Sequence, residues 1–215
     1  MQSLARGLAV IRAFDTARPR MTQAEVAEAT GLTRAAARRF LRTLESLGYV
    51  RSDGREYALT PRVLELGYSY LSALTLPELA QPHLERLSRE LDESVSAAVL
   101  DDDEIVYVAR VPTRRIMSVA ITIGTRFPAD RTSMGHVLVA ARDGNERPWA
   151  LADQELEAGL RSVAAPLHGR DGVIAAINVS TSTARVSREE LLERHLAALL
   201  ETARAIDGDL AAAGL

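Results

Sequence analysis

The sequence predicts an α+β protein of two domains, and three observations support this. Apolar residues recur at helical spacing towards both ends of the chain, whereas several central stretches are rich in β-branched residues and alternate like strands. At 215 residues the chain is long enough for two modest cores. Residues 1–62 hold 11 Arg and 6 acids (+5), and residues 63–215 hold 15 Arg and 23 acids (−8). We therefore expect a domain 1–62, a linker helix 63–76 and a domain 77–215.

The first domain begins with a predicted amphipathic helix over residues 3–15, which two further helices follow. Thr22 and Glu25 have capping-box spacing at the start of the second helix, and Gly31 ends that helix. Thr33 is the expected N-cap of the third helix, which ends at Gly48. A helix, a glycine-containing turn and a helix form the pattern of a helix-turn-helix motif.

Two short strands, 49–51 and 57–59, flank the turn Asp53-Gly54 and complete a wing. In such a module the second helix of the motif enters the major groove, where arginine binds guanine edges or phosphates. Together with the local positive charge, this pattern favours binding of double-stranded DNA over a merely solvated helix face. The predicted DNA-contacting residues are Thr22, Thr33, Arg34, Ala36, Ala37, Arg38, Arg39, Arg42, Arg51 and Arg55.

The linker helix opens at Pro61, and its apolar residues Leu64, Tyr70, Leu71 and Leu74 predict packing against a second copy of the chain. Beyond it we expect an antiparallel sheet flanked by helices, which completes the α+β class. The expected elements are a helix 77–91, strands 94–100, 105–111 and 116–123, a short helix to Ala141, strands 162–167 and 173–180, and a final helix 188–211.

Several other classes of protein are disfavoured. No apolar run reaches the roughly 18 residues of a membrane helix. The chain start has no signal-peptide pattern and cysteine is absent, so a cytoplasmic location is expected. The four histidines lack metal-ligand spacing, and neither a nucleophile elbow nor a glycine-rich phosphate loop is present. We expect no enzymatic activity, no cofactor and no bound metal.

Several runs of the sequence resemble the IclR family of bacterial regulators. These runs are 4–11, 31–41, 47–50, 57–67, 104–111, 132–135, 159–166 and 176–180. Within the family, residues 33–40 and 110–117 look most like the regulators of aromatic-acid breakdown through protocatechuate and β-ketoadipate, the Pca subfamily. The resemblance implies a homodimer or a dimer of dimers, a homotetramer, on a palindromic operator. It also implies a GAF-like C-terminal domain that binds a small carboxylate effector such as protocatechuate or a β-ketoadipate-like acid.

The resemblance also implies an effector site, formed by Ser133, Met134, Gly135, Asp153, Ser162, Asn178 and Ser180. A pocket for a carboxylate needs a few converging polar groups on an otherwise apolar wall. Asn178 and Ser180 are two residues apart on one strand, so they share a face that is turned either to a ligand or to solvent. Arg126 and Arg161 are candidates either for the effector carboxylate or for surface ion pairs.

One departure from the family concerns the connection after Ala141. Family members carry an additional, mostly helical segment of roughly 35 residues there, whereas here only residues 142–148 precede Trp149. Two functions therefore stay open. One is a transcriptional regulator of aromatic-acid catabolism controlled by a small anionic metabolite. The other is a ligand-independent DNA-binding dimer whose C-terminal domain serves only oligomerisation.

Overall fold

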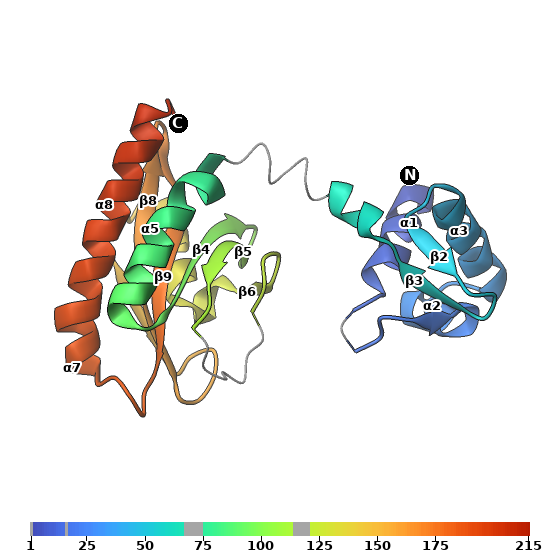
Figure 1. The fold of residues 1–215 in the computed structure, drawn as a ribbon, viewed down its shortest axis with the longest axis horizontal. Coiled ribbons are helices and arrows are strands. Elements are labelled where there is room, and N and C mark those ends of the chain that lie inside the picture. The colour runs from blue at the N-terminus through green and yellow to red at the C-terminus, as the bar shows by residue number, and fades with distance from the viewer. Residues whose placement is uncertain (1, 16, 67–74, 114–120) are drawn as a thin grey trace. The chain divides into compact units, whose positions relative to one another are not determined.

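The computed structural model of the chain describes residues 2–15, 17–66, 75–113 and 121–215. The chain folds into two compact units, Met1–Ala73 and Leu74–Leu215, which are considered separately below (Figure 1). Within the described ranges, no helix is both long enough and apolar enough to cross a membrane.

The N-terminal unit is a three-helix motif with a small antiparallel sheet, as predicted. Its elements are α1 (Gln2–Arg12), β1 (Met21–Thr22), α2 (Gln23–Thr30), α3 (Arg34–Ser46), β2 (Val50–Ser52), β3 (Glu56–Leu59) and the 3-10 helix η1 (Pro61–Val63). The sheet order is β1-β3-β2, in which β2 and β3 form the predicted wing hairpin. Strand β1 was not predicted, because two residues are too short to show an alternating pattern.

Capping residues begin and end the helices of the motif where the sequence predicts. Thr22 Oγ1 accepts a hydrogen bond from the Glu25 backbone N–H at 3.4 Å, and the Thr22 N–H donates to the Glu25 carboxylate at 2.6 Å. Gly31 ends α2 with φ +66°, a conformation that glycine adopts without strain. Thr33 Oγ1 accepts from the Ala36 N–H at 3.2 Å and begins α3. The two predicted N-caps are thus confirmed.

The core of this unit joins all three helices to the small sheet. Each helix contributes one apolar stripe, so the opposite faces stay in solvent. Burial of several large side chains at about 1.5–3 kcal/mol each offsets the cost of ordering so short a chain. The buried residues are Val10, Phe14, Met21, Val26, Ala27, Ala37, Leu41, Leu44 and Val50.

The C-terminal unit is an antiparallel sheet with helices on both faces. Its elements are α5 (Thr75–Leu91), β4 (Ser94–Asp101), β5 (Glu104–Val111), β6 (Arg126–Pro128), η2 (Ala129–Arg131), α6 (Ser133–Arg142), β7 (Ala150–Asp153), β8 (Leu160–Gly169), β9 (Gly172–Ser182), α7 (Arg188–Glu190), η3 (Leu191–His195) and α8 (Leu196–Ala212). The order of the six strands is β6-β5-β4-β9-β8-β7, and all neighbouring pairs are antiparallel. The predicted α+β class is confirmed.

The two faces of this sheet have separate cores. Helices α5 and α8 lie side by side on one face (Figure 1), where Leu84 and Ile206 pack with Ile177. Helix α6 covers the other face, where Met134 packs with Ala164. Small residues occupy much of the sheet beneath α6, so this second face leaves room beside the helix.

Several predicted elements differ from the structure. Of the expected strand 116–123, residues 116–120 lie outside the described residues, and 121–123 lead into a turn; the edge strand is β6 instead. Strand β7 was missed because its sequence, Ala-Leu-Ala-Asp, has no β-branched residue. The final helix is interrupted by a π-helical turn at Leu191–His195. In the predicted linker helix, residues 64–66 are helical, and Tyr70, Leu71 and Leu74 lie outside the described residues.

Candidate DNA interface and sensor pocket

Helix α3 is held at its first turn by contacts with α2. The Gln23 side chain donates from Nε2 to the carbonyl oxygen of Arg34 at 2.9 Å, across the turn between the helices. Together with the Thr33 cap, this contact fixes the N-terminus of α3 relative to α2. The N-terminal residues of the second helix are those that contact bases in helix-turn-helix proteins.

The exposed face of α3 carries four arginines. Arg34, Arg38, Arg39 and Arg42 are exposed, and within the described part of the chain none of their guanidinium groups forms an ion pair or a hydrogen bond. Arg34, Arg38 and Arg42 follow one another at four-residue spacing, so they lie along one side of the helix. These donors are therefore available to an external anion.

The small residues predicted on this helix divide between surface and core. Ala36 is half-buried beside the exposed Arg34, so it allows close approach of a partner. Ala37 is fully buried against the core of the unit, and its prediction as a DNA contact was wrong. The error arose because the first helical turn was taken as a whole, although only one side of a helix can face the groove.

The remaining predicted threonines act mainly as caps. Thr22 is half-buried, and its hydroxyl donates to the Glu25 carboxylate at 2.7 Å. Thr33 is exposed, and its hydroxyl accepts from the N–H of Ala36. The two caps fix where α2 and α3 begin. They thereby help to set the position of α3, the recognition helix.

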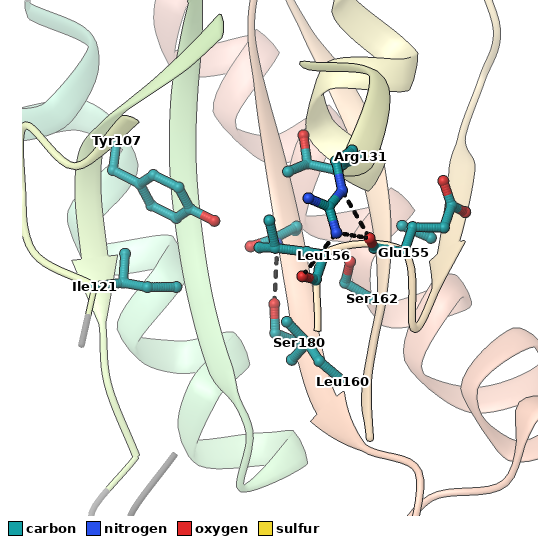
Figure 2. A pocket seen from close by; sticks show the side chains of 11 residues that line it. Tyr107, Ile121, Arg131, Glu155, Leu156, Leu160, Ser162 and Ser180 are labelled. Atoms are coloured by element: carbon teal, nitrogen blue, oxygen red, sulfur yellow. Dashed lines mark hydrogen bonds between the residues drawn. The ribbon is translucent and has the colours of Figure 1, made fainter. Parts of the chain in front are cut away.

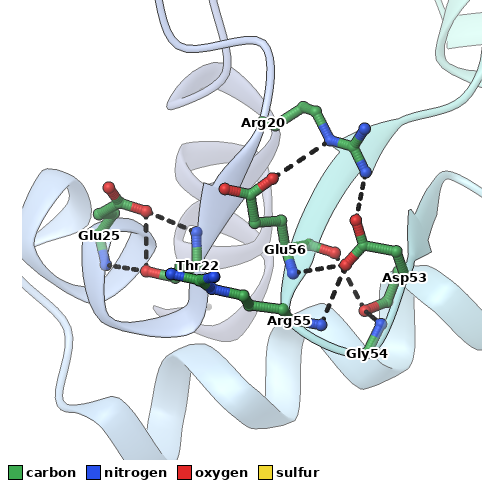
Figure 3. Close-up of polar contacts among 8 residues, drawn as sticks. Arg20, Thr22, Glu25, Asp53, Gly54, Arg55 and Glu56 are labelled. Atoms are coloured by element: carbon green, nitrogen blue, oxygen red, sulfur yellow. Dashed lines mark hydrogen bonds and ion pairs between the residues drawn. The ribbon is translucent and has the colours of Figure 1, made fainter.

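The wing turn is held by a single carboxylate (Figure 3). Asp53 Oδ1 accepts from the backbone N–H groups of Glu56 at 2.8 Å and Arg55 at 3.0 Å, and these hydrogen bonds lower the pKa of Asp53. Arg20 pairs with Asp53 and, at 3.4 Å, with Glu56. Arg51 and Arg55 are exposed, and neither forms an ion pair with a described residue. Arg55 does interact electrostatically with Glu25, but neither wing arginine is held in an ion pair by a described residue.

The sheet face under α6 carries a cluster of polar side chains. Ser162 of β8 lies opposite Ser180 of β9, and Asn178 lies opposite Ser96 of β4. Since directly paired residues share a face, Ser162, Ser180 and Asn178 point to the same side of the sheet. The Asn178 Nδ2 donates to Ser180 Oγ at 3.0 Å, and Asn178 Oδ1 is buried with no hydrogen-bond partner in the described residues.

These side chains line a narrow pocket whose free volume of about 20 Å³ holds little more than one water molecule, so an effector has to widen it. Figure 2 shows Tyr107 and Ile121 on one side and Ser162, Ser180 and Leu160 on the other. Desolvation raises the pKa of the Tyr107 hydroxyl to about 12, so the phenol stays neutral. Three predicted effector residues, Ser162, Asn178 and Ser180, thus converge here. Ser133 does not line the pocket, but its Oγ lies 2.8 Å from the Oγ of Ser162, which does.

The other predicted effector residues do not line this pocket. Met134 is fully buried in the core between α6 and the sheet. Gly135 packs against η2, where an added Cβ would lie 2.0 Å from the Ala129 oxygen. Asp153 accepts an ion-paired hydrogen bond from Arg161 Nε at 2.8 Å. Met134 and Gly135 position the start of α6, and Asp153 lies at the edge of the sheet. The spacing of residues along the chain cannot tell such a structural role from contact with a ligand.

Both arginines suggested for the effector are engaged elsewhere. Arg126 pairs with Asp101 and Glu104, each at 2.7 Å, and Arg161 pairs with Asp153. Their alternative interpretation as ion-paired residues is therefore the correct one. Sequence reasoning missed the other eight residues that line the pocket, Tyr107 and Arg131 among them. The signal for Tyr107 was weak, because a β-bulge at Ala97–Ala98 changes the register that alternation would give.

A winged helix-turn-helix with unpaired arginines on its recognition helix, joined to a unit with a polar pocket, defines a DNA-binding regulatory protein. The model of the IclR helix-turn-helix domain matches residues 3–54, and that of the bacterial transcriptional regulator IclR C-terminal domain matches residues 68–148 and 145–208. The chain belongs to the IclR family of transcriptional regulators and is not an enzyme.

Individual relatives agree with this assignment. The Pca regulon regulatory protein of Pseudomonas putida is 43% identical over 95% of this chain and 82% of its own length. A regulator from Rhodococcus sp. RHA1 matches with a TM-score of 0.86 and 50% identity, over 99% of both chains. An IclR homologue from Microbacterium hydrocarbonoxydans, crystallised with 4-hydroxybenzoate, shares the fold with a TM-score of 0.85 and 22% identity, over 98% of this chain and 99% of that one.

The comparisons also bear on the short connection between α6 and β7. The alignment with the Pseudomonas putida protein runs over 239 positions, more than the 215 residues of this chain, so that relative has residues without a counterpart here. The C-terminal family model matches in two segments that meet at residues 145–148. This is the connection where the sequence predicts a missing segment.

Proposed function

We propose that this protein is a sequence-specific regulator of aromatic-acid catabolism whose C-terminal unit binds a small anionic metabolite. The observation that carries the proposal is the convergence of Ser162, Asn178 and Ser180 on one pocket beside Tyr107. Hydroxyl and amide groups beside the apolar side chains of Ile121 and Leu160 suit an aromatic ring with polar substituents. The Pca relative and the homologue crystallised with 4-hydroxybenzoate give the same chemical class further support.

On the DNA side, we propose that Arg34, Arg38 and Arg42 contact the operator through the major groove, with Arg51 and Arg55 on the flanking backbone. An isolated set of exposed cations on a helix attracts phosphate and guanine edges without first having to break an ion pair. A homodimer or a dimer of dimers would present two such helices to a palindromic operator.

The DNA contact is tested with Arg34→Ala on the DNA upstream of the gene. We expect its affinity to fall by about 1–3 kcal/mol, roughly fivefold to over a hundredfold, because a bidentate arginine–guanine contact is lost. The matched control is Arg18→Ala, since Arg18 is exposed in the same unit but pairs with Asp15 at 3.5 Å. Affinity within twofold of wild type for Arg34→Ala in gel-shift titrations would place the recognition helix elsewhere.

The sensor is tested by thermal unfolding with protocatechuate, 4-hydroxybenzoate and β-ketoadipate. A ligand at 100 times its Kd stabilises the folded state by about 2.7 kcal/mol, so a clear rise in Tm is expected with at least one acid. Calorimetry on the same acids gives the Kd directly. If none of them binds, the ligand-independent dimer becomes the better proposal, and the short connection between α6 and β7 would be its structural cause.

A further inference from the structure

Arg110 lies on the sheet face that carries the pocket, and the proposed function gives this charged group no role. It lies on β5 opposite Ser96 of β4, and Ser96 in turn lies opposite Asn178 of β9. The three residues therefore form a row across the sheet, on the face that carries the pocket. Arg110 Nη1 donates to Ser96 Oγ at 3.1 Å.

The charge of Arg110 has no carboxylate partner in the described part of the chain. Its side chain is half-buried, and its buried Nε has no hydrogen-bond partner there. An unpaired, partly desolvated guanidinium is costly, because burial removes water and nothing replaces the lost interaction. Desolvation accordingly lowers the pKa of Arg110 from its usual value, although the group stays charged.

An unmatched acceptor lies in the same row. Asn178 Oδ1 is buried without a partner among the described residues, although its Nδ2 is bonded to Ser180. Asn178 lines the pocket together with Tyr107, and Tyr107 is close enough to Arg110 for the two to interact electrostatically. An unmatched cationic donor thus lies in the same row of the sheet as an unmatched acceptor that lines the pocket.

Two other arginines near this face are engaged by acceptors within the chain. Arg131 lines the pocket, but it donates from Nε and Nη2 to the carbonyl oxygen of Glu155 at 2.9 and 2.7 Å. A third hydrogen bond, of 3.2 Å, joins Arg131 Nη2 to the Leu156 oxygen. Arg161 pairs with Asp153 instead. Arg131 thus holds the loop at the pocket mouth, while Arg110 keeps its charge unpaired.

We propose that Arg110 binds the carboxylate of the effector and that Asn178 Oδ1 accepts a hydrogen bond from a hydroxyl group of the effector. The inference rests on the proposed sensor function and narrows it to the group that recognises the carboxylate. The Arg110 guanidinium supplies a positive charge that no described acid neutralises, beside the neutral side chains of Ser96 and Asn178. Hydrogen bonds to charged groups are the strong ones, so this contact would dominate selectivity.

The test is calorimetry on the full chain with 4-hydroxybenzoate and its methyl ester as probes. Wild type is expected to bind the acid at least tenfold more tightly than the ester, because the ester has no charge for Arg110. Arg110→Met should lose at least tenfold affinity for the acid while binding the ester as wild type does. The matched control is Arg126→Met, which removes an exposed arginine that already pairs with two acids and should leave the affinity for both probes unchanged.

Folding and function are separated by two further measurements. Operator gel shifts and the thermal melt of each variant report whether it folds, and Arg110→Lys, which keeps the charge without the planar fork, should lose less affinity than Arg110→Met. Equal acid binding by wild type and both Arg110 variants overturns the role of Arg110 and leaves the sensor function standing. If wild type binds neither probe nor the other aromatic acids, the sensor function fails and the inference fails with it.

Discussion

Arg34 and Arg38 in the N-terminal unit extend from α3 without an acid partner in the described residues, whereas Arg161 and Arg185 in the C-terminal unit pair with Asp153 and Glu93. All four carry the same charge, so their surroundings decide the difference. Pairing within the chain stabilises a fold, while an unpaired cation keeps its donors for an anion from outside.

Arg110 lies in the C-terminal unit, but like Arg34 and Arg38 in the N-terminal unit it has no acid partner among the described residues. It is half-buried like the ion-paired Arg161, yet its only hydrogen-bond partner among the described residues is the neutral hydroxyl of Ser96. By the two proposals made above, the chain has two anion-binding regions, one on the recognition helix and one under α6. The first faces a polyanion in solvent, and the second suits a small ligand that can be largely desolvated.

The largest expected effect comes from breaking a structural pair. Glu93 is buried, and its Oε1 accepts from Thr181 Oγ1 at 2.9 Å and from Arg185. Arg185→Ala should lower the free energy of unfolding by about 2 kcal/mol, because the buried carboxylate loses a cationic hydrogen-bond donor. Urea unfolding followed by the fluorescence of Trp149, the single tryptophan, measures this in the C-terminal unit.

The counterpart in the N-terminal unit is Arg34→Ala, which should change stability by no more than about 0.5 kcal/mol. The operator affinity of Arg34→Ala should fall. The operator affinity of Arg185→Ala should stay near the wild-type value under conditions in which that variant is folded. Equal losses of stability in the two variants would remove the distinction between paired and unpaired arginines.

A smaller effect is expected on the wing. Arg55 is exposed and without an ion pair in the described residues, so Arg55→Ala should reduce the slope of log affinity against log salt by about 1, as for one lost phosphate contact. Arg18→Ala should leave the slope unchanged, because Arg18 pairs with Asp15. Fluorescence anisotropy with operator DNA at several salt concentrations measures both slopes, and a parallel decrease in the two variants would indicate a general effect of net charge.

The smallest effect concerns His168, a titratable cation with a structural role. Burial disfavours its charged ring, but hydrogen bonds to Glu146 at 2.9 Å and Asp207 at 2.8 Å outweigh burial and raise the pKa of His168 above 6.5. The folded pKa exceeds the unfolded one, so this stabilisation is complete below about pH 6.5 and is lost as the pH rises through the raised value.

His168→Gln should therefore destabilise the C-terminal unit at about pH 6 and much less at about pH 9. Because the His168 side chain is 40% exposed, the difference should stay below about 1 kcal/mol. Unfolding free energies of wild type and variant at the two pH values provide the measurement. A variant whose deficit grows with pH would show that the contacts do not depend on the protonated ring.

Local signals in the sequence predicted most of the N-terminal unit. The caps at Thr22 and Thr33 and the turn at Gly31 act over three or four residues, so their effect can be deduced without tertiary contacts. The same reasoning failed for Ala37, because which side of α3 faces the core depends on α1 and on the wing. Strands β6 and β7 also escaped prediction, since short edge strands are defined by the neighbour with which they pair.

By itself, the sequence determined the α+β class, the helix-turn-helix with its wing, and the family, because caps, periodicity and motifs are local properties of the chain. Only the tertiary structure decided which residues form the pocket. It moved Met134 into the core, paired Asp153 with Arg161, and placed Arg110 in one row with Ser96 and Asn178. Those relations join strands that are far apart in sequence, and strand register together with burial, rather than residue type, decides whether a charge is paired or free.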